Sequence, residues 1–382
     1  MMRFMRGNSG DFFGAFADSA ILLPVVSLLS TRAGFSLPAL LISTGALYLV
    51  SGWLFRAPMP VQPLKSIALS ALALGAAAGE IRSATLLLGA GFLLLALFGR
   101  ELLQLPEEVI RCVQWGLGLL LILQGLGSWK ESPLDAGITC ALASLLLFLS
   151  RISRVPWLGI FSFLVFLASL RFTHDHGFPS LAHFPANEPF RWPMVASLLL
   201  PQLALTSANS ILGTELAFRE YFPKRDNTLL RPRLLFSIGI GNLLMSVLGG
   251  LPFCHGSGGL TAHIRAGARS ARMNAVIGST LIGLGLLQST APSLGPLPGI
   301  PASAILLSVG ILHLGLARGL FESNSGCAML FLATFVTLGT RNLLYTLFAT
   351  ILFSVFLRPG SNPSAKRVLG SLFKKQTKRE AR

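Results

Sequence analysis

Two short stretches of this 382-residue chain combine helix-breaking residues with polar groups, although the sequence around them is largely apolar. They are PMPVQPLKS (58–66) and PFCHGSGGL (252–260). Proline keeps the backbone extended at the start of each stretch, which then runs into residues that favour a helix. The first N–H groups of such a helix are unpaired and carry about half a positive charge. Two helix ends of this kind that face each other predict a binding site for an anion.

Side chains near the two predicted helix starts extend this site. The first helix is expected to begin near Gln62–Pro63, so that Gln62 and Ser66 share a face with Lys65. The second is expected to begin near Gly258, where glycines permit a turn and a close approach of the backbone to the anion. The residues of the second stretch that we predict to bind the anion are His255, Gly256, Ser257, Gly258 and Gly259.

Two of these residues have an alternative interpretation. A lysine at membrane depth is energetically costly, which makes Lys65 a functional candidate, but its long side chain also allows the amine to reach the cytoplasmic interface. His255 follows Cys254, yet two ligands without others nearby make a weak metal site. We therefore predict neither a metal ion nor another cofactor.

A third polar cluster lies in PQLALTSANS (201–210). Gln202, Thr206 and Asn209 form one stripe on an otherwise apolar helix. The stripe suits the wall of a binding cavity. The alternative is that it joins neighbouring helices through hydrogen bonds.

The elements that position these groups are membrane helices. The chain is 52% hydrophobic and 12% charged with a mean hydropathy of +0.68, whereas soluble domains carry about 25% charge. Apolar runs such as LLLGAGFLLLALFG (86–99) recur, and a spanning helix needs roughly 20 mostly apolar residues. The sequence therefore predicts an all-α polytopic membrane protein. Its four cysteines are scattered and contain no CxxC pair, which argues against a disulfide framework.

Charged and Pro/Gly-rich breaks divide the chain into about 14 transmembrane segments, about seven on each side of a long polar loop. With both termini in the cytoplasm, 24 of the 31 Lys and Arg residues fall on the cytoplasmic side, as the positive-inside rule expects. Lys65 lies within the membrane, and the six outside are Arg32, Arg82, Lys130, Arg171, Arg191 and Arg341. This placement indicates a plasma membrane protein (in bacteria, of the inner membrane) whose charge faces lipid headgroups rather than nucleic acid.

An odd number of segments on each side of the loop makes the two halves inverted repeats, an architecture of many secondary transporters. We predict a first repeat at 1–172 (segments 1–7), an extracytoplasmic loop at 173–192, a second repeat at 193–357 (segments 8–14) and a basic cytoplasmic tail at 358–382. The two interrupted stretches are then the third and tenth segments. Interruptions at corresponding positions point to a transporter binding site, where we expect the two half-helices to meet at mid-membrane.

Two acidic residues are candidates for coupling or gating. Asp18, in the first segment, would bind a coupling proton or pair with Lys65, and the alternative is a packing role near the interface. Glu215 is the second candidate, although it also suits a role in balancing the arginines that follow it. The coupling ion, a proton or another ion, is left open.

Three segments resemble the signature segments of the molybdate transporter family of plants and bacteria, a branch of the SulP sulfate-permease superfamily. They are PMPVQPLKSIA (58–68), PQLALTSANS (201–210) and LPFCHGSGGLTAHIRAGARSA (251–271). The resemblance covers about residues 11–355. It implies fourteen segments, a core domain of segments 1–4 and 8–11, a gate domain of segments 5–7 and 12–14, and an anion bound between the third and tenth segments.

The chain departs from the family's pattern at two places. Ala17-Asp18-Ser19-Ala20 stands where similar proteins have Gly-Asp-x-Gly, and Ala204 stands where proline is common. Both departures lie at the expected cavity, so they affect the prediction of which anion is transported. The STAS domain of many SulP proteins is not expected, because 25 residues follow the last predicted segment and the molybdate branch similarly lacks that domain.

The leading hypothesis is a secondary active transporter that takes up a tetrahedral oxyanion, molybdate, by alternating access. The alternatives on the same fold are a carrier of sulfate, of another small anion or of a nucleobase, followed by a passive anion channel. An enzyme is not predicted, because HExxH, GxSxG and similar motifs are lacking. The expected partners are the oxyanion, a coupled proton or other ion, and the lipid bilayer, and the sequence leaves a homodimer open.

Overall fold

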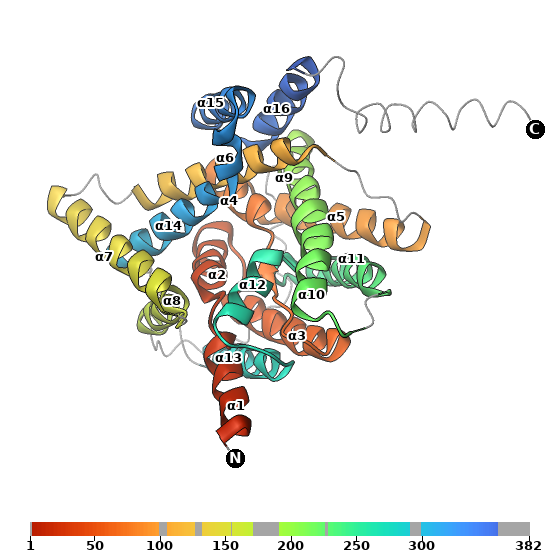
Figure 1. Ribbon diagram of the computed structural model, residues 1–382, viewed down its shortest axis with the longest axis vertical. Coiled ribbons are helices and arrows are strands. Elements are labelled where there is room, and N and C mark those ends of the chain that lie inside the picture. Colours follow the sequence, from red (N-terminus) through yellow and green to blue (C-terminus); the bar gives the residue numbers. More distant parts are fainter. Residues whose placement is uncertain are drawn as a thin grey trace, which may run out of the picture.

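A computed structural model describes residues 2–98, 105–126, 132–153, 155–170, 191–225, 228–290 and 299–357 of the chain (Figure 1). The predicted basic tail and nearly all of the predicted loop at 173–192 lie outside these residues. In chain order the elements are α1 (Met2–Ala15), α2 (Ser19–Ala33), α3 (Leu37–Phe55), β1 (Gln62–Pro63), α4 (Lys65–Leu74), α5 (Ala78–Phe98), α6 (Glu107–Leu126), α7 (Pro133–Ile152), α8 (Trp157–Ser169), α9 (Trp192–Leu205), the π-helix η2 (Thr206–Gly213), α10 (Thr214–Tyr221), α11 (Leu230–Leu248), β2 (Phe253–Cys254), α12 (Ser257–Arg265), α13 (Arg272–Thr290), α14 (Gly299–Leu314), the 3₁₀ helix η3 (Gly315–Glu322), α15 (Asn324–Thr340) and α16 (Leu343–Leu357).

Helices dominate the described residues, as the composition predicts. Seven helical stretches among them are long and apolar enough to cross a membrane. They are Ser9–Ala33, Leu37–Phe55, Ala78–Leu97, Glu107–Leu126, Pro133–Ile152, Trp192–Tyr221 and Gly299–Glu322. Further apolar helices, including α4, α8, α15 and α16, are shorter than a full span. The structure is thus that of a multi-pass, all-α membrane protein.

The helices pack in two groups. In one group, α3 packs along α13 and α5 packs along α11; in the other, α6 contacts α14, α15 and α16, and α7 contacts α14. Figure 1 shows α7, α14, α15 and α16 to the left and top of the view, and α3, α5 and α11 to the right and bottom. Contacts of α2 with α8 and of α9 with α16 join the two groups. The short helix α12 contacts α1, η2 and α10.

The two interrupted stretches meet in a two-stranded antiparallel ladder. Gln62 of β1 pairs with Cys254 of β2, and Pro63 pairs with Phe253. Leu64 N–H then donates to the carbonyl of Pro252 at 2.9 Å. Because this pairing extends through Leu64, α4 begins at Lys65 and not at Pro63, and Gln62 does not share a helical face with Ser66 as the sequence suggested. The start of α12 at Ser257 is one residue from the predicted position.

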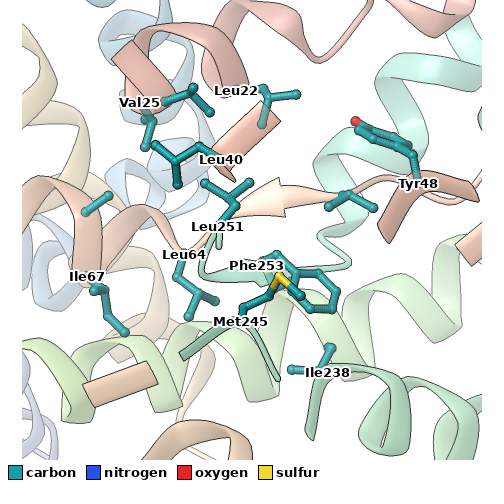
Figure 2. Close-up of a cluster of buried hydrophobic side chains, with 14 of the residues drawn as sticks. Leu22, Val25, Leu40, Tyr48, Leu64, Ile67, Ile238, Met245, Leu251 and Phe253 are labelled. Atoms are coloured by element: carbon teal, nitrogen blue, oxygen red, sulfur yellow. The ribbon is translucent and has the colours of Figure 1, made fainter. Parts of the chain in front are cut away.

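Apolar side chains enclose this ladder. Figure 2 shows Leu64, the residue before α4, near Leu251 and Phe253 of the second stretch, with Ile67 of α4 on its other side and Met245 of α11 beside Phe253. All of these side chains are buried. The core of this region draws on α2, α3, α4, α11 and α12. Extended backbone at membrane depth is tolerated only where protein surrounds it or water reaches it, and here protein surrounds it.

Two buried asparagines hold the extended backbone in place. Asn242 of α11 accepts from Phe253 N at 3.0 Å and donates to Phe253 O at 2.8 Å. Asn274 of α13 makes the same pair of bonds to Met59: its Oδ1 accepts from Met59 N at 3.1 Å, and its Nδ2 donates to Met59 O at 2.6 Å. His255 adds a third tie, because its Nδ1 lies 2.7 Å from the carbonyl oxygen of Pro60. Side chains therefore satisfy part of the extended backbone in each stretch, and the ladder satisfies further peptide groups.

The first segment of each predicted half is also irregular. The helix of the first half is interrupted at 16–18, between α1 and α2, which places Asp18 at the N-cap of α2. In the second half, the π-helix η2 separates α9 from α10. A π-turn inserts one extra residue and changes the direction of the side chains that follow it. Both irregular segments pack against the interrupted stretches, since α2 contacts β1 and η2 contacts α12.

Candidate functional site

A cavity of about 1700 Å³ lies between the two groups of helices. One wall comes from α2, α4, η2 and α12, and the facing wall comes from α6, α14 and the residues that begin α8. Its inner end is formed by Gln62, Pro63 and Cys254 of the ladder. A volume above the ~300–1,000 Å³ of typical ligand pockets indicates an open vestibule with a narrower site at its inner end.

Basic residues surround the outer part of this cavity. Arg111, Arg151, Arg265 and Arg269 all line it, and all four belong to loops or helix ends that the charge distribution predicts to be cytoplasmic. Arg151, Arg265 and Arg269 are exposed. Clustered positive charge at the mouth of a cleft attracts anions and raises their local concentration.

The N-terminus of α12 is the part of the inner site where backbone donors are available. The first three N–H groups of this helix, those of Ser257, Gly258 and Gly259, have no hydrogen-bond acceptor among the described residues. Gly258 is exposed to the cavity, and a Cβ atom added to it would meet open space. Unpaired N–H groups and the positive end of the helix dipole together suit a negatively charged ligand.

The N-terminus of α4 differs, because a side chain of the protein occupies it. Gln202 Oε1 accepts from Ser66 N at 2.9 Å and from Ile67 N at 3.3 Å. Gln202 Nε2 in turn donates to Thr206 Oγ1 at 2.9 Å. Lys65 N–H is the one N–H group of this first turn without an acceptor in the described part of the chain. The expectation of two equally free helix ends is therefore wrong for α4.

Two polar side chains complete the inner site. Ser257 Oγ donates to Asn209 Oδ1 at 2.6 Å, and both residues line the cavity. Asn209 Oδ1 is used in this bond, so its Nδ2 group is the donor that remains for a ligand. Lys65 is half-buried in the cavity wall, and its amine has no ion-pair partner among the described residues. The inner site thus combines α12 N–H groups, an amide and an unpaired ammonium.

The predicted site residues divide into those that line the cavity and those that do not. Lining residues among them are Asp18, Gln62, Lys65, Gln202, Asn209, Ser257 and Gly258. The remaining ones, which lie outside its lining, are Ser66, Thr206, His255, Gly256, Gly259 and Glu215. Thr206 and Ser66 are fully buried, and they support the cap on α4 rather than face the cavity.

His255 is a structural residue rather than a lining one. It is fully buried between Phe55 and Phe253, and both ring nitrogens have partners, Pro60 O at 2.7 Å and Ser237 Oγ at 2.9 Å. Its imidazole has no donor left for an anion. Within the described residues no group of three or more metal-binding side chains exists.

The two candidate acids occupy different environments. Glu215 forms ion pairs with Arg219 at 2.8 Å and with Arg231 at 2.6 Å, which matches its alternative role of balancing neighbouring arginines. Asp18 is 4% exposed, accepts from Gln62 Nε2 at 2.7 Å and makes no ion pair with Lys65. Asp18, and not Glu215, is the acid at the inner end of the cavity.

Sequence reasoning missed four buried polar residues around the site. His313 of α14 lines the cavity from the facing wall, and His263 of α12 is fully buried beneath it. Asn242 and Asn274, the backbone clamps described above, are the other two. Asn242, Asn274 and His313 are isolated polar residues in largely apolar helices, whereas His263 lies within the polar third signature segment. That signal marks helix contacts in membrane proteins but does not say what is contacted.

The Arg-x-Gly-Ala-Arg-Ser part of the third signature segment forms a turn held by α1. Asp11 Oδ1 accepts from Arg269 N at 2.6 Å and from Ser270 N at 3.0 Å. Gly267 adopts φ of +106°, a conformation that favours glycine, and it lies against Gly10. This motif therefore fixes the end of α12 and the basic rim of the cavity instead of contacting its inner end.

The arrangement of helices resembles that of solved anion transporters. The transmembrane domain of a cyanobacterial bicarbonate transporter, BicA, matches with a TM-score of 0.61 and 17% identity over 92% of this chain and 98% of that one. The murine Slc26a9 anion transporter, solved in the inward-facing state, matches with a TM-score of 0.64 and 14% identity over 91% of this chain and 68% of that one. These likenesses define the class: a multi-pass membrane protein with an SLC26-like fold.

The sequence identifies the family within that class. Residues 10–121 and 194–314 match the family described as "Molybdate transporter of MFS superfamily", and the chain belongs to this family. Molybdate transporter 2 of Arabidopsis thaliana is 28% identical over 375 residues, covering 81% of this chain and 79% of that protein. Molybdate transporter 1 of the same plant is 26% identical over 395 residues, covering 88% and 85%. The resemblance carried by the three signature segments is confirmed, and the family is one of transporters, not of enzymes.

Proposed function

We propose that this protein is a secondary active transporter that takes up molybdate by alternating access, with the anion held at the N-terminus of α12. Membership of the molybdate transporter family supports the substrate. The observation that carries the proposed site is the set of three N–H groups without an acceptor among the described residues, at Ser257, Gly258 and Gly259. Of these residues, Ser257 and Gly258 line the cavity with the basic mouth.

The donors at the inner site suit a tetrahedral dianion. Helix N–H groups, the amide of Asn209 and the ammonium of Lys65 approach from different elements, and each can donate to a separate oxygen atom. Together, one full positive charge and the α12 dipole oppose the two negative charges of molybdate. Gln202, which the sequence placed among the ligands, contributes by holding the first turn of α4 and thereby the position of Lys65.

The proposal includes a 7+7 inverted repeat, with a first repeat at 1–172 and a second at 193–357. Exchange of the two halves maps α3 onto α11 and α5 onto α13. Under this exchange the α3–α13 contact becomes the α11–α5 contact, and the structure contains both, each along the length of the helices. The exchange also maps β1 onto β2 and α6 onto α14, so the ladder and the α6–α14 contact each join two equivalent elements. These exchanges support two half-helices, α4 and α12, that meet inside the membrane.

We further propose that the two groups of helices are the moving domains. The core domain would comprise segments 1–4 and 8–11, and the gate domain segments 5–7 and 12–14. The cavity runs along their boundary and opens where the predicted cytoplasmic arginines lie, which supports an inward-open conformation in a plasma membrane or bacterial inner membrane. Displacement of one domain against the other would open the site to the opposite side.

Uptake of a dianion requires a source of energy. Moving two negative charges inward against a membrane potential of about 100 mV costs about 4.6 kcal/mol. A cation that enters with the anion offsets this cost, and Asp18 is the acid in the cavity wall that could bind one. Coupling to a cation is therefore part of the proposal.

Uptake of labelled molybdate into proteoliposomes containing the purified protein tests the function. We expect saturable uptake that unlabelled molybdate inhibits more strongly than sulfate. Sulfate has the same charge and shape, so equal inhibition by sulfate would contradict a molybdate transporter and favour the sulfate alternative. Uptake that does not saturate and needs no ion gradient would favour a channel instead.

A further inference from the structure

Asp18 is a buried acid whose two carboxylate oxygens differ in their hydrogen bonding. The residue is 4% exposed, and its Oδ1 accepts from Gln62 Nε2 at 2.7 Å. Oδ2 is buried and has no hydrogen-bond partner among the described residues. A buried carboxylate oxygen without a donor is costly, and such atoms in native structures call for an explanation.

Gln62 provides the complementary observation. Its Oε1 is also buried and without a partner in the described part of the chain. The amide that carries Oε1 is the one whose Nε2 already binds Asp18 Oδ1. A proton on Asp18 Oδ2 would turn that oxygen into a donor, and Gln62 Oε1 is the acceptor that lacks one. Asp18 and Gln62 would then form a cyclic acid–amide pair with both orphaned atoms satisfied.

We infer that Asp18 and Gln62 form a proton-binding site whose proton enters with the molybdate. The inference rests on the proposed transport function and specifies its coupling ion. The proton adds to Asp18 Oδ2 when the site faces the outside, and it leaves to water on the cytoplasmic side through the cavity described above. No redox or group-transfer step is involved.

Gln62 also connects this site to the N-terminus of α12. A Cβ atom added to Gly259 would lie 2.8 Å from Gln62 Nε2, so the amide packs directly on the backbone that offers the anion its N–H groups. An unprotonated Asp18 places a negative charge in the wall of the same cavity, which opposes an anion there. Protonation removes that charge and occupies Gln62 Oε1. Proton and molybdate binding therefore favour each other, and this coupling is reciprocal.

Other titratable groups face Asp18 from the elements packed around it. His263 of α12, Lys65 of α4, Tyr48 of α3 and Cys254 of β2 all interact electrostatically with it. His263 is the one with a free proton-accepting atom, because its Nδ1 donates to Gly14 O at 2.7 Å and its Nε2 is buried without a partner among the described residues. His263 is thus the alternative proton site that an experiment must separate from Asp18.

The test uses the purified full chain in proteoliposomes and two assays. Exchange of labelled for unlabelled molybdate without ion gradients measures transport alone, and accumulation driven by an acidic exterior measures coupling. Asp18→Asn is the informative variant, because its amide reproduces the protonated acid: Oδ1 accepts from Gln62 and Nδ2 donates to it. Glu215→Gln is the matched control, a buried carboxylate already satisfied by two arginines.

We expect the wild-type protein and Glu215→Gln to accumulate molybdate when the exterior is acidic. Asp18→Asn is expected to keep exchange within about threefold of wild type and to lose the accumulation. The dissociation constant of wild type should rise up to about tenfold per pH unit on the alkaline side, and that of Asp18→Asn should not change. A dye inside wild-type liposomes should also report proton entry with molybdate, which requires no variant.

Several results would overturn the inference. Accumulation that follows a sodium gradient but not a pH gradient would replace the proton with another cation. Retained accumulation in Asp18→Asn, with loss in His263→Gln, would move the proton site to His263. Molybdate exchange by the wild-type protein without proton entry would contradict proton coupling but would leave the proposed molybdate transport supported. Absence of wild-type exchange would instead contradict the proposed function itself.

Discussion

The two half-helices α4 and α12 begin at the same ladder, yet their N-termini are built for different purposes. At α4, Gln202 accepts from two backbone N–H groups, so that this end is closed by the protein. At α12, three N–H groups have no acceptor among the described residues, and Gly258 opens to the cavity. A capped helix end is a structural element, and an uncapped one at the end of a cavity is a binding element.

The difference arises from the irregular segments that pack on each end. The segment containing α9 places an amide against α4, and an amide oxygen is a good cap for a helix N-terminus. The segment containing α1 and α2 places Asp18 near α12, but this carboxylate bonds to Gln62 instead of to the helix N–H groups. A carboxylate capping α12 would compete with an anionic substrate for the same donors. The α4 end contributes a charge through Lys65, whereas the α12 end contributes its backbone.

The largest effect is expected at the asparagine clamps, because an asparagine holds the extended stretch before each half-helix. Asn274→Ala and Asn242→Ala each remove a two-bond clamp and leave a buried N–H and a buried C=O unpaired. We expect each to lower the free energy of unfolding by about 2–4 kcal/mol. Thermal unfolding of the detergent-solubilised variants measures this, with Asn324→Ala, at the exposed start of α15, as a control of unchanged stability. Stability equal to wild type in either clamp variant would show that its extended stretch is held by packing alone.

Removal of the charge at the α4 end should have the next largest effect. Lys65→Met keeps much of the side-chain volume but loses a charge-assisted hydrogen bond to the anion, worth about 1.5–3 kcal/mol. We expect kcat/KM for molybdate uptake to fall about 10- to 150-fold, with unfolding unchanged or improved. Lys65→Arg retains the charge and is expected to recover part of the activity. Normal uptake by Lys65→Met would assign this lysine to the membrane interface.

Gln202 and Asn209 belong to the same polar stripe, but Gln202 contacts the N-terminus of α4 and Asn209 contacts that of α12. Variants of these two residues therefore test the two helix ends independently. Gln202→Leu uncaps α4 and is expected to cost about 1–2 kcal/mol of stability. Asn209→Leu breaks a bond to the Ser257 hydroxyl and leaves the α12 backbone as it is, so it should affect molybdate affinity more than stability. Unfolding curves and uptake kinetics of both variants provide the comparison. If both variants lose stability and affinity to the same degree, the two ends are equivalent.

The smallest effect is expected from a methyl group at the α12 end. Gly258→Ala introduces a Cβ atom into open space, so folding should be unaffected, but the methyl group faces the cavity beside the proposed anion. We expect KM for molybdate to rise about fivefold, or about 1 kcal/mol. Gly91→Ala, also in open space but in α5 away from the cavity, is the matched control. Equal KM values for both variants would argue against an anion at Gly258.

Local signals in the sequence were sufficient to find both interrupted stretches. Proline and glycine act on the backbone of their own and neighbouring residues, so the start of α12 was predicted to within one residue. The start of α4 was predicted too early, because Leu64 N–H is taken by Pro252, 188 positions away in the chain. A long-range backbone bond of this kind leaves no local pattern.

Whether each polar group was free or already occupied could not be predicted from the sequence. Gln202 lines the cavity, but its bond to Ser66 joins residues 136 positions apart. His255 looked like a donor for the anion, yet Pro60 and Ser237 occupy both of its nitrogens. Residue type and helical spacing indicate which side chains face a common region. They do not reveal which of them are already satisfied, and this decides which remain for the substrate.

Anomalous diffraction at the molybdenum absorption edge, from crystals grown with molybdate, tests the central claim most directly. The account predicts one strong peak at the inner end of the cavity, with oxygen atoms about 3 Å from the backbone nitrogens of Ser257, Gly258 and Gly259. Lys65 and Asn209 should border the same density. A peak among the arginines of the cavity mouth, or one at the N-terminus of α4 with Gln202 displaced, would contradict it.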